Sequence, residues 1–148
     1  MANVDFMPLK VRIGEIFKDY MKIDLVDIQT ENLTTSLKSY SSAVESEVSG
    51  AAKGKIVLLS DNNLANSIAK AFSSVPGSIS NEEVLAELLN ILLGNIESHI
   101  INDENKKLIF RIPKKSSIEV IQKQLGNSRF SVTFKTETSA GCCIYIQT

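Results

Sequence analysis

Several residue types are scarce in this sequence of 148 residues, and each scarcity removes a class of function. There is one histidine, His99, and the only two cysteines, Cys142 and Cys143, are adjacent. A histidine-rich metal site and the two-histidine metalloprotease motif are therefore excluded, and two thiols alone make no zinc site. A vicinal disulfide would be strained. Because neighbouring strand residues point to opposite faces of a sheet, we expect two reduced thiols, one of them buried.

An excess of charge and long apolar runs are also missing. Sixteen basic and seventeen acidic residues leave a formal net charge of −1, whereas a nucleic-acid-binding domain needs a clustered basic face. No apolar run reaches the roughly 18 residues of a membrane span. The N-terminal residues lack the basic and apolar regions of a secretory signal, and reduced thiols are typical of the cytoplasm. The sequence therefore predicts a cytoplasmic protein that binds neither nucleic acid nor membrane.

The composition that remains is ordinary for a globular protein. Hydrophobic residues make up 43% of the chain and charged residues 22%. The length is sufficient to bury one core, and we find no linker, low-complexity tract or internal repeat. Residues 1–148 are therefore predicted to form a single domain.

The spacing of the apolar residues predicts an α+β fold. Helical spacing occurs over 8–23, over 61–72 after a capping Ser60-Asp61 pair, and over 80–101. Period-two alternation or short apolar runs predict strands at 37–48, 55–59, 108–112, 130–134 and 143–146, with turns at 50–54 and 138–141. Residues 116–125 fit either a helical turn or irregular coil. The sum is a largely antiparallel sheet of at least five strands, covered by about three helices.

The most hydrophobic stretch, from Ser80 to Ile101, is predicted to be one long helix. Ser80 followed by Glu83 is the sequence pattern of a capping box, which marks a helix start. At about 100° per residue, apolar side chains cover more than half of the circumference. The other positions form a narrow polar seam: Glu83, Glu87, Asn90, Gly94, Glu97 and Ser98. His99 lies in the apolar arc, so we interpret it as a structural residue or one at a subunit contact, not as a catalytic base.

Glu87 and Asn90 are the candidate site residues of this seam. A spacing of three places both side chains on the same helix face, one turn apart. The carboxylate can accept hydrogen bonds from a lysine or guanidinium, and the amide can orient a water molecule without ionising. Gly94 lies one turn further, and because a helical glycine costs about 1 kcal/mol relative to alanine, it suggests room for an approaching backbone. The alternative interpretation is a solvated polar stripe, because Glu-x-x-Asn is a short pattern.

The segment from Glu87 to Asn95 resembles the active-site helix of the CheC/CheX chemotaxis phosphatases. The pattern of that family is Glu-x-x-Asn, then apolar residues and a Gly-Asn or Gly-Gly pair. The resemblance covers residues 53–95 well and extends to the C-terminal hairpin. The N-terminal helix offers only Glu15-Ile-Phe-Lys18, which lacks the amide of a second motif. A single site in a short chain is more similar to CheX than to CheC.

The resemblance implies a CheC-like fold and a specific activity. The chain would be a hydrolase that removes the aspartyl phosphate of a phosphorylated CheY-like response regulator. Asn90 would position the attacking water, Glu87 would pair with the regulator's active-site lysine, and Gly94 and Asn95 would contact the regulator. The regulator would supply the aspartate and Mg²⁺, so the chain would need no metal or cofactor of its own. The resemblance also implies a homodimer, which suits a small protein with many edge strands.

Two other interpretations remain open. The chain could be a non-catalytic CheC-like module that binds a regulator or acts as a scaffold in chemotaxis or two-component signalling. It could also be an unrelated small α+β dimer with a solvated stripe. A structure that buries the face of Glu87, Asn90 and Gly94 in its own core would favour this last interpretation.

Overall fold

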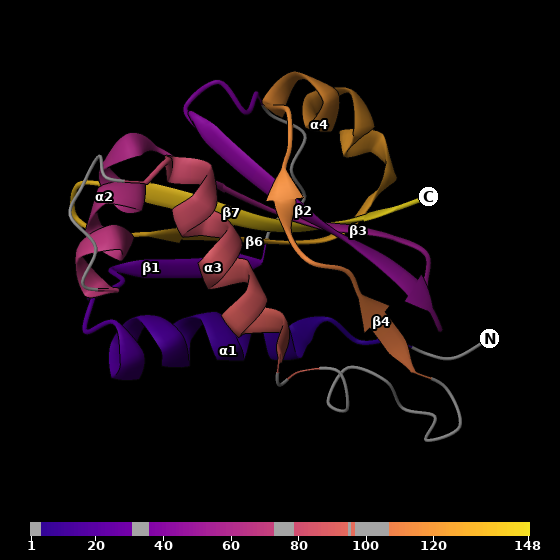
Figure 1. Ribbon diagram of the computed structural model, residues 1–148, viewed down its shortest axis with the longest axis horizontal. Coiled ribbons are helices and arrows are strands. Elements are labelled where there is room, and N and C mark those ends of the chain that lie inside the picture. Colours follow the sequence, from indigo (N-terminus) through magenta and orange to yellow (C-terminus); the bar gives the residue numbers. More distant parts are fainter. Residues whose placement is uncertain (1–3, 31–35, 73–78, 95, 97–106) are drawn as a thin grey trace.

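Seven β-strands form one antiparallel sheet in the computed structural model, which describes residues 4–30, 36–72, 79–94, 96 and 107–148 (Figure 1). The strands are β1 (Asp27–Thr30), β2 (Ser42–Gly50), β3 (Gly54–Ser60), β4 (Leu108–Phe110), β5 (Lys114–Lys115), β6 (Ser128–Lys135) and β7 (Ala140–Gln147). Their order is β1-β6-β7-β3-β2-β4, and β5 also pairs with β2. The predicted α+β class and the largely antiparallel sheet of at least five strands are confirmed.

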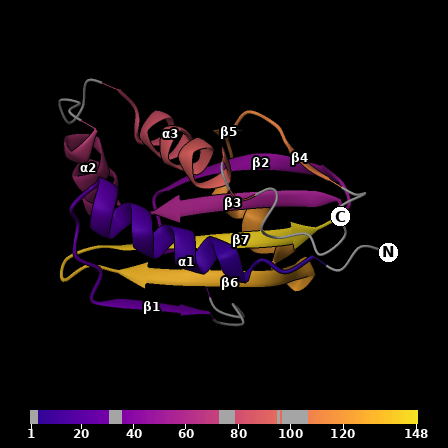
Figure 2. The ribbon, with the colours of Figure 1, turned by 90° about the horizontal axis from the view of Figure 1, so that it is seen from below.

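The helices lie on both faces of this sheet (Figure 2). They are α1 (Met7–Glu15), the π-helix η1 (Ile16–Tyr20), α2 (Asn62–Ala71), α3 (Asn81–Gly94), α4 (Ile118–Gln124) and the 3-10 helix η2 (Leu125–Asn127). The first three α-helices cover one face, and α4 lies on the other (Figures 1 and 2). Residues 118–124 are thus helical, which decides the question that the sequence left open.

Strand alternation divides the apolar side chains between two cores. On the central strand β3, Ile56 and Leu58 point towards α1–α3, whereas Val57 and Leu59 join the smaller core beneath α4. Cys143 and Cys142 follow the same alternation on the neighbouring strand β7. Neither cysteine forms a disulfide and both are buried, so the expectation of a single buried thiol was wrong. The reason is that helices cover both faces of the sheet at β7, which a strand pattern alone does not show.

Burial makes the Cys143 thiol a source of pH-dependent stability. Desolvation raises its pKa from an ordinary value of 9.0 to about 12. Below pH 9 the thiol is protonated in both the folded and the unfolded chain and has no effect on the pH dependence. Between pH 9 and 12 the thiol ionises in the unfolded chain but not in the folded one, so the free energy of unfolding falls as the pH rises. We expect Cys143→Ala to be less stable at pH 7 but to lose less further stability between pH 9 and 11, as measured by urea unfolding. Parallel curves for the two proteins would contradict this assignment.

Three predicted elements have different bounds in the structure. The strand predicted from Leu37 begins at Ser42, because Leu37 packs into the core beneath α4 and residues 38–39 form a turn. The strand predicted at 108–112 ends at Phe110, and Pro113 interrupts the edge before β5. The N-terminal helix changes at Ile16 into a π-helix, in which the N–H of Met21 donates to the carbonyl of Ile16 (2.8 Å).

The helix predicted at 80–101 is described from Asn81 to Gly94. Ile96 lies in a turn, not in a continuing helix, and the remaining positions of the prediction, including His99, lie outside the described residues. The break predicted at 73–77 also lies outside them. The helix predicted at 61–72 is confirmed as α2, where the Asp61 side chain caps the N-terminus by accepting from the backbone N–H of Leu64 (2.8 Å).

Candidate functional site

Helix α3 carries the predicted site residues and lies against strands β2 and β3 (Figure 1). Its start is fixed by Ser80, whose hydroxyl oxygen accepts from the backbone N–H of Glu83 (3.1 Å), as the predicted cap requires. Six apolar side chains on the opposite side are buried: Val84, Leu85, Leu88, Leu89, Leu92 and Leu93. At about 25 cal/mol per Å² of apolar surface, this burial holds the helix firmly to the sheet. The seam is therefore presented on a rigid support.

Side-chain contacts at its N-terminal turn tie α3 to the rest of the fold. The Glu82 carboxylate lies 3.5 Å from the ammonium group of Lys115 on β5. The Asn81 side-chain amide donates to Asn62 of α2, at 2.9 Å. Both contacts involve residues beside the polar seam, and neither uses the side chain of a predicted site residue. Lys115 belongs to a stretch whose structure the sequence did not define, so its place next to α3 could not be predicted.

The polar seam faces solvent over its whole described length. Glu83, Glu87, Asn90 and Gly94 are exposed, whereas the residues on either side of Glu87 and Asn90 are buried or half-buried. The structure thus brings Glu87 and Asn90 together on one exposed face, with Cβ atoms about 5–6 Å apart as helical spacing requires. The face is not buried in the protein's own core, which was the observation that would have favoured an unrelated fold with a solvated stripe.

The side chains of Glu87 and Asn90 have no polar partner among the described residues. Within the described ranges, no hydrogen bond or ion pair of either side chain is present. A carboxylate and an amide without such partners keep their donors and acceptors for another molecule. Their arrangement can bind a cation through the carboxylate and orient a polar group or a water molecule through the amide.

Gly94 ends α3 beside the same face. A Cβ atom built on this residue would meet no other atom within 4 Å, so no packing inside the described part of the protein requires a glycine here. That Gly94 allows a partner to approach stays a prediction. Asn95, the other predicted partner-binding residue, lies outside the described residues.

Two features are absent from the described residues. No cluster of three or more His, Cys, Asp or Glu side chains that could hold a metal ion occurs among residues 4–30, 36–72, 79–94, 96 and 107–148. No helix there is both long and apolar enough to cross a membrane.

The fold is of the CheC/CheX type, a class of chemotaxis proteins, as solved structures demonstrate. No protein-family model matches the sequence, and no curated protein is significantly similar to it. The likeness is thus one of three-dimensional structure, and it extends over nearly the whole chain.

Three crystal structures illustrate the likeness. A chain of the CheX–CheY–BeF3–Mg²⁺ complex from Borrelia burgdorferi superposes with a TM-score of 0.72 at 16% identity, covering 98% of this chain and 99% of that one. For the chemotaxis protein CheX from Desulfovibrio desulfuricans the TM-score is 0.65 at 10% identity, and the superposition covers 96% of this chain and 97% of that one. For a CheC-like chemotactic protein from Shewanella oneidensis it is 0.63 at 11% identity, with 95% of both chains covered. At these identities the likeness shows the fold, and the site is argued from the residues of this chain.

Proposed function

We propose that this protein is a phosphatase that hydrolyses the aspartyl phosphate of a CheY-like response regulator. The observation that carries the proposal is the exposed Glu87–Asn90 pair on α3 of a CheX-type fold, a pair that has no polar partner within the described ranges. The Borrelia burgdorferi structure of this fold is a complex with CheY, BeF3 and Mg²⁺, which supports a regulator as the partner.

The proposed reaction is an in-line displacement at phosphorus. A water oxygen attacks the phosphorus atom, the bond to the aspartyl oxygen breaks, and the products are inorganic phosphate and the aspartate carboxylate, with the water proton passing to phosphate or solvent. The Asn90 carbonyl oxygen accepts a hydrogen bond from the attacking water, and its NH₂ group donates to a phosphoryl oxygen. The amide remains neutral throughout, so its contribution is the position of the water and the stabilisation of developing charge.

Glu87 has a different role in this proposal. One turn before Asn90, its carboxylate pairs with the active-site lysine of the regulator and fixes the orientation of α3 over the phosphoryl group. The regulator provides the aspartate and the Mg²⁺ that neutralises phosphoryl charge, so both are part of the substrate. Gly94 leaves space beside the pair for the backbone of the regulator.

The direct test is phosphate release from purified candidate regulators. Each regulator is phosphorylated on its aspartate, and the loss of phosphate is followed with and without the protein. Acceleration for at least one CheY-like regulator is the expected result. Stable binding of a phosphorylated regulator whose phosphate is retained would instead identify the protein as a non-catalytic binding or scaffold module. Neither binding nor release with any regulator would refute both functions.

Glu87→Ala is expected to raise the regulator concentration at half-maximal rate by about tenfold or more, because a charge pair across the interface is lost. For the wild-type protein, the regulator concentration at half-maximal rate should also rise with ionic strength more steeply than for the variant, since salt screens this attraction. The matched control is Glu119→Ala, which removes the same charge from exposed α4 on the other face of the sheet. Equal behaviour of the two variants would show that Glu87 does not contact the regulator.

A further inference from the structure

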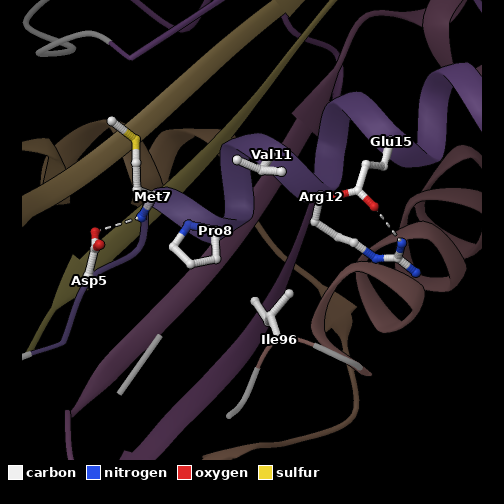
Figure 3. A pocket seen from close by; sticks show the side chains of 7 residues that line it. All are labelled: Asp5, Met7, Pro8, Val11, Arg12, Glu15 and Ile96. Carbon is white, nitrogen blue, oxygen red and sulfur yellow. Dashed lines mark hydrogen bonds and ion pairs between the residues drawn. The ribbon is translucent and has the colours of Figure 1, made fainter. Parts of the chain in front are cut away.

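A groove with an apolar wall lies near the C-terminal end of α3. Its volume is about 540 Å³, and it lies between α1 and the turn that follows α3 (Figure 3). Met7, Pro8 and Val11 form the wall on α1, and Ile96 faces them from the turn (Figure 3). Ile96 is buried and follows Gly94 by two residues, so the groove lies close in the chain to the end of the exposed site face.

The α1 side of this groove exposes more apolar surface than the core requires. The side chain of Val11 is 60% exposed and that of Met7 is 45% exposed, while Leu9 and Ile13 on the same helix are fully buried. The buried pair attaches α1 to the sheet, and the exposed parts of Met7 and Val11 are not used in that attachment. Adjacent large exposed apolar side chains beside a groove are typical of a surface that another molecule covers.

The charges around the groove indicate what that molecule carries. Asp5 and Glu15 are exposed on its rim, and Glu83 and Glu87 are exposed on the seam of α3. Arg12 is the cation among the described residues that line the groove, and its guanidinium lies 3.6 Å from the Glu15 carboxylate, so these two charges largely offset each other (Figure 3). The acidic groups that remain are Asp5, Glu83 and Glu87. The surface as a whole therefore favours a partner with basic groups around an apolar side chain.

We infer that the α1 groove is a second contact surface for the same response regulator, and this inference rests on the proposed function. The regulator would place an apolar side chain between Val11 and Ile96 while its active-site region lies over Glu87 and Asn90. The groove would then select among regulators by a surface remote from the phosphate, since receiver domains share the chemistry of their active sites but differ outside them.

A second copy of this chain suits the groove less well. A two-fold contact over Val11 would bring identical acidic rims towards each other, and like charges at an interface are unfavourable. It would also cover the end of the seam at Gly94, which a regulator needs to reach. A basic, partly apolar regulator surface meets neither obstacle.

The test compares Val11→Lys with Val120→Lys in the full chain. Both changes place a lysine on an exposed helical valine, on α1 and on α4 respectively, which lie on opposite faces of the sheet. We expect Val11→Lys to weaken binding of a regulator activated with BeF3 and Mg²⁺ by at least about tenfold in calorimetry, because an apolar contact is lost and a like charge is added. The rate at saturating phosphorylated regulator should remain within about twofold of wild type, and Val120→Lys should match wild type in both measurements.

The outcomes separate the inference from the function on which it rests. If the wild-type protein binds and dephosphorylates a regulator but Val11→Lys does so equally well, the groove inference is wrong and the function stands. If Val11→Lys changes the oligomeric state in light scattering and leaves regulator binding unchanged, the groove belongs to a second copy and the inference is again wrong. If binding weakens as expected while no protein releases phosphate, the groove is supported and the phosphatase function is refuted.

Discussion

Asn90→Ala is expected to lower the accelerated rate of phosphate release by at least about 100-fold, the usual cost of removing one pre-positioned polar group from a reaction site. The loss should appear in the rate at saturating regulator, because the amide acts on the water and the phosphoryl group. Binding of the activated regulator should change by no more than a few-fold, since Glu87 and the surrounding surface remain. Single-turnover release with phosphorylated regulator, together with calorimetric binding, measures the two quantities separately.

Stability provides the control for this prediction. Asn90 is exposed and free of contacts within the described residues, and alanine is the better helix former by about 0.5 kcal/mol. The variant should therefore unfold at the same temperature as wild type or slightly above it. Asn127→Ala, at an exposed asparagine that follows α4, is the matched substitution away from the site and should keep full activity. Undiminished phosphate release by Asn90→Ala would exclude the proposed mechanism.

The candidate site was predictable because helical periodicity depends only on local sequence. Glu83, Glu87, Asn90 and Gly94 fall at intervals of three or four residues, and the structure exposes all four while it buries the leucines between them. The Ser80 cap likewise follows from the chemistry of adjacent residues. Such features are encoded within one or two helical turns, so a single sequence is sufficient to place them. The roles of Glu87 and Asn90 remain predictions.

Features that depend on distant parts of the chain were not predictable in this way. Strands β1 and β5 are too short to show an alternating pattern, and each exists because it pairs with a longer neighbour, β6 and β2 respectively. The burial of Cys142 depends on α4, and the groove at Val11 depends on the approach of α1 to the end of α3. A helical pattern on α1 shows which residues face outward, but not what lies beside them.

Gly54→Ala is expected to cost about 3 kcal/mol or more of folding stability, the largest loss that we predict for a single methyl group in this protein. Gly54 begins the central strand β3 with φ of +154°, a conformation that is rare for residues with a side chain. A Cβ atom here would overlap the backbone carbonyl oxygen of Ile146 on β7. Backbone cannot move aside as a flexible side chain does. The hydroxyl of Tyr145 on β7 also donates to the backbone carbonyl oxygen of Lys53 (2.9 Å), which fixes the turn against β7.

The consequence extends to the site because α3 packs on β3 as well as on β2. A displaced β3 would lose its register with β7, and the support beneath Glu87 and Asn90 would shift with it. We expect the melting temperature of Gly54→Ala to fall by roughly 10 °C, measured by circular dichroism. Gly14→Ala is the matched control, since its Cβ would meet no atom within 4 Å in the described structure, and in α1 it should raise stability by up to about 1 kcal/mol. A Gly54→Ala protein as stable as wild type would show that the close approach of β3 to β7 at this turn is wrong.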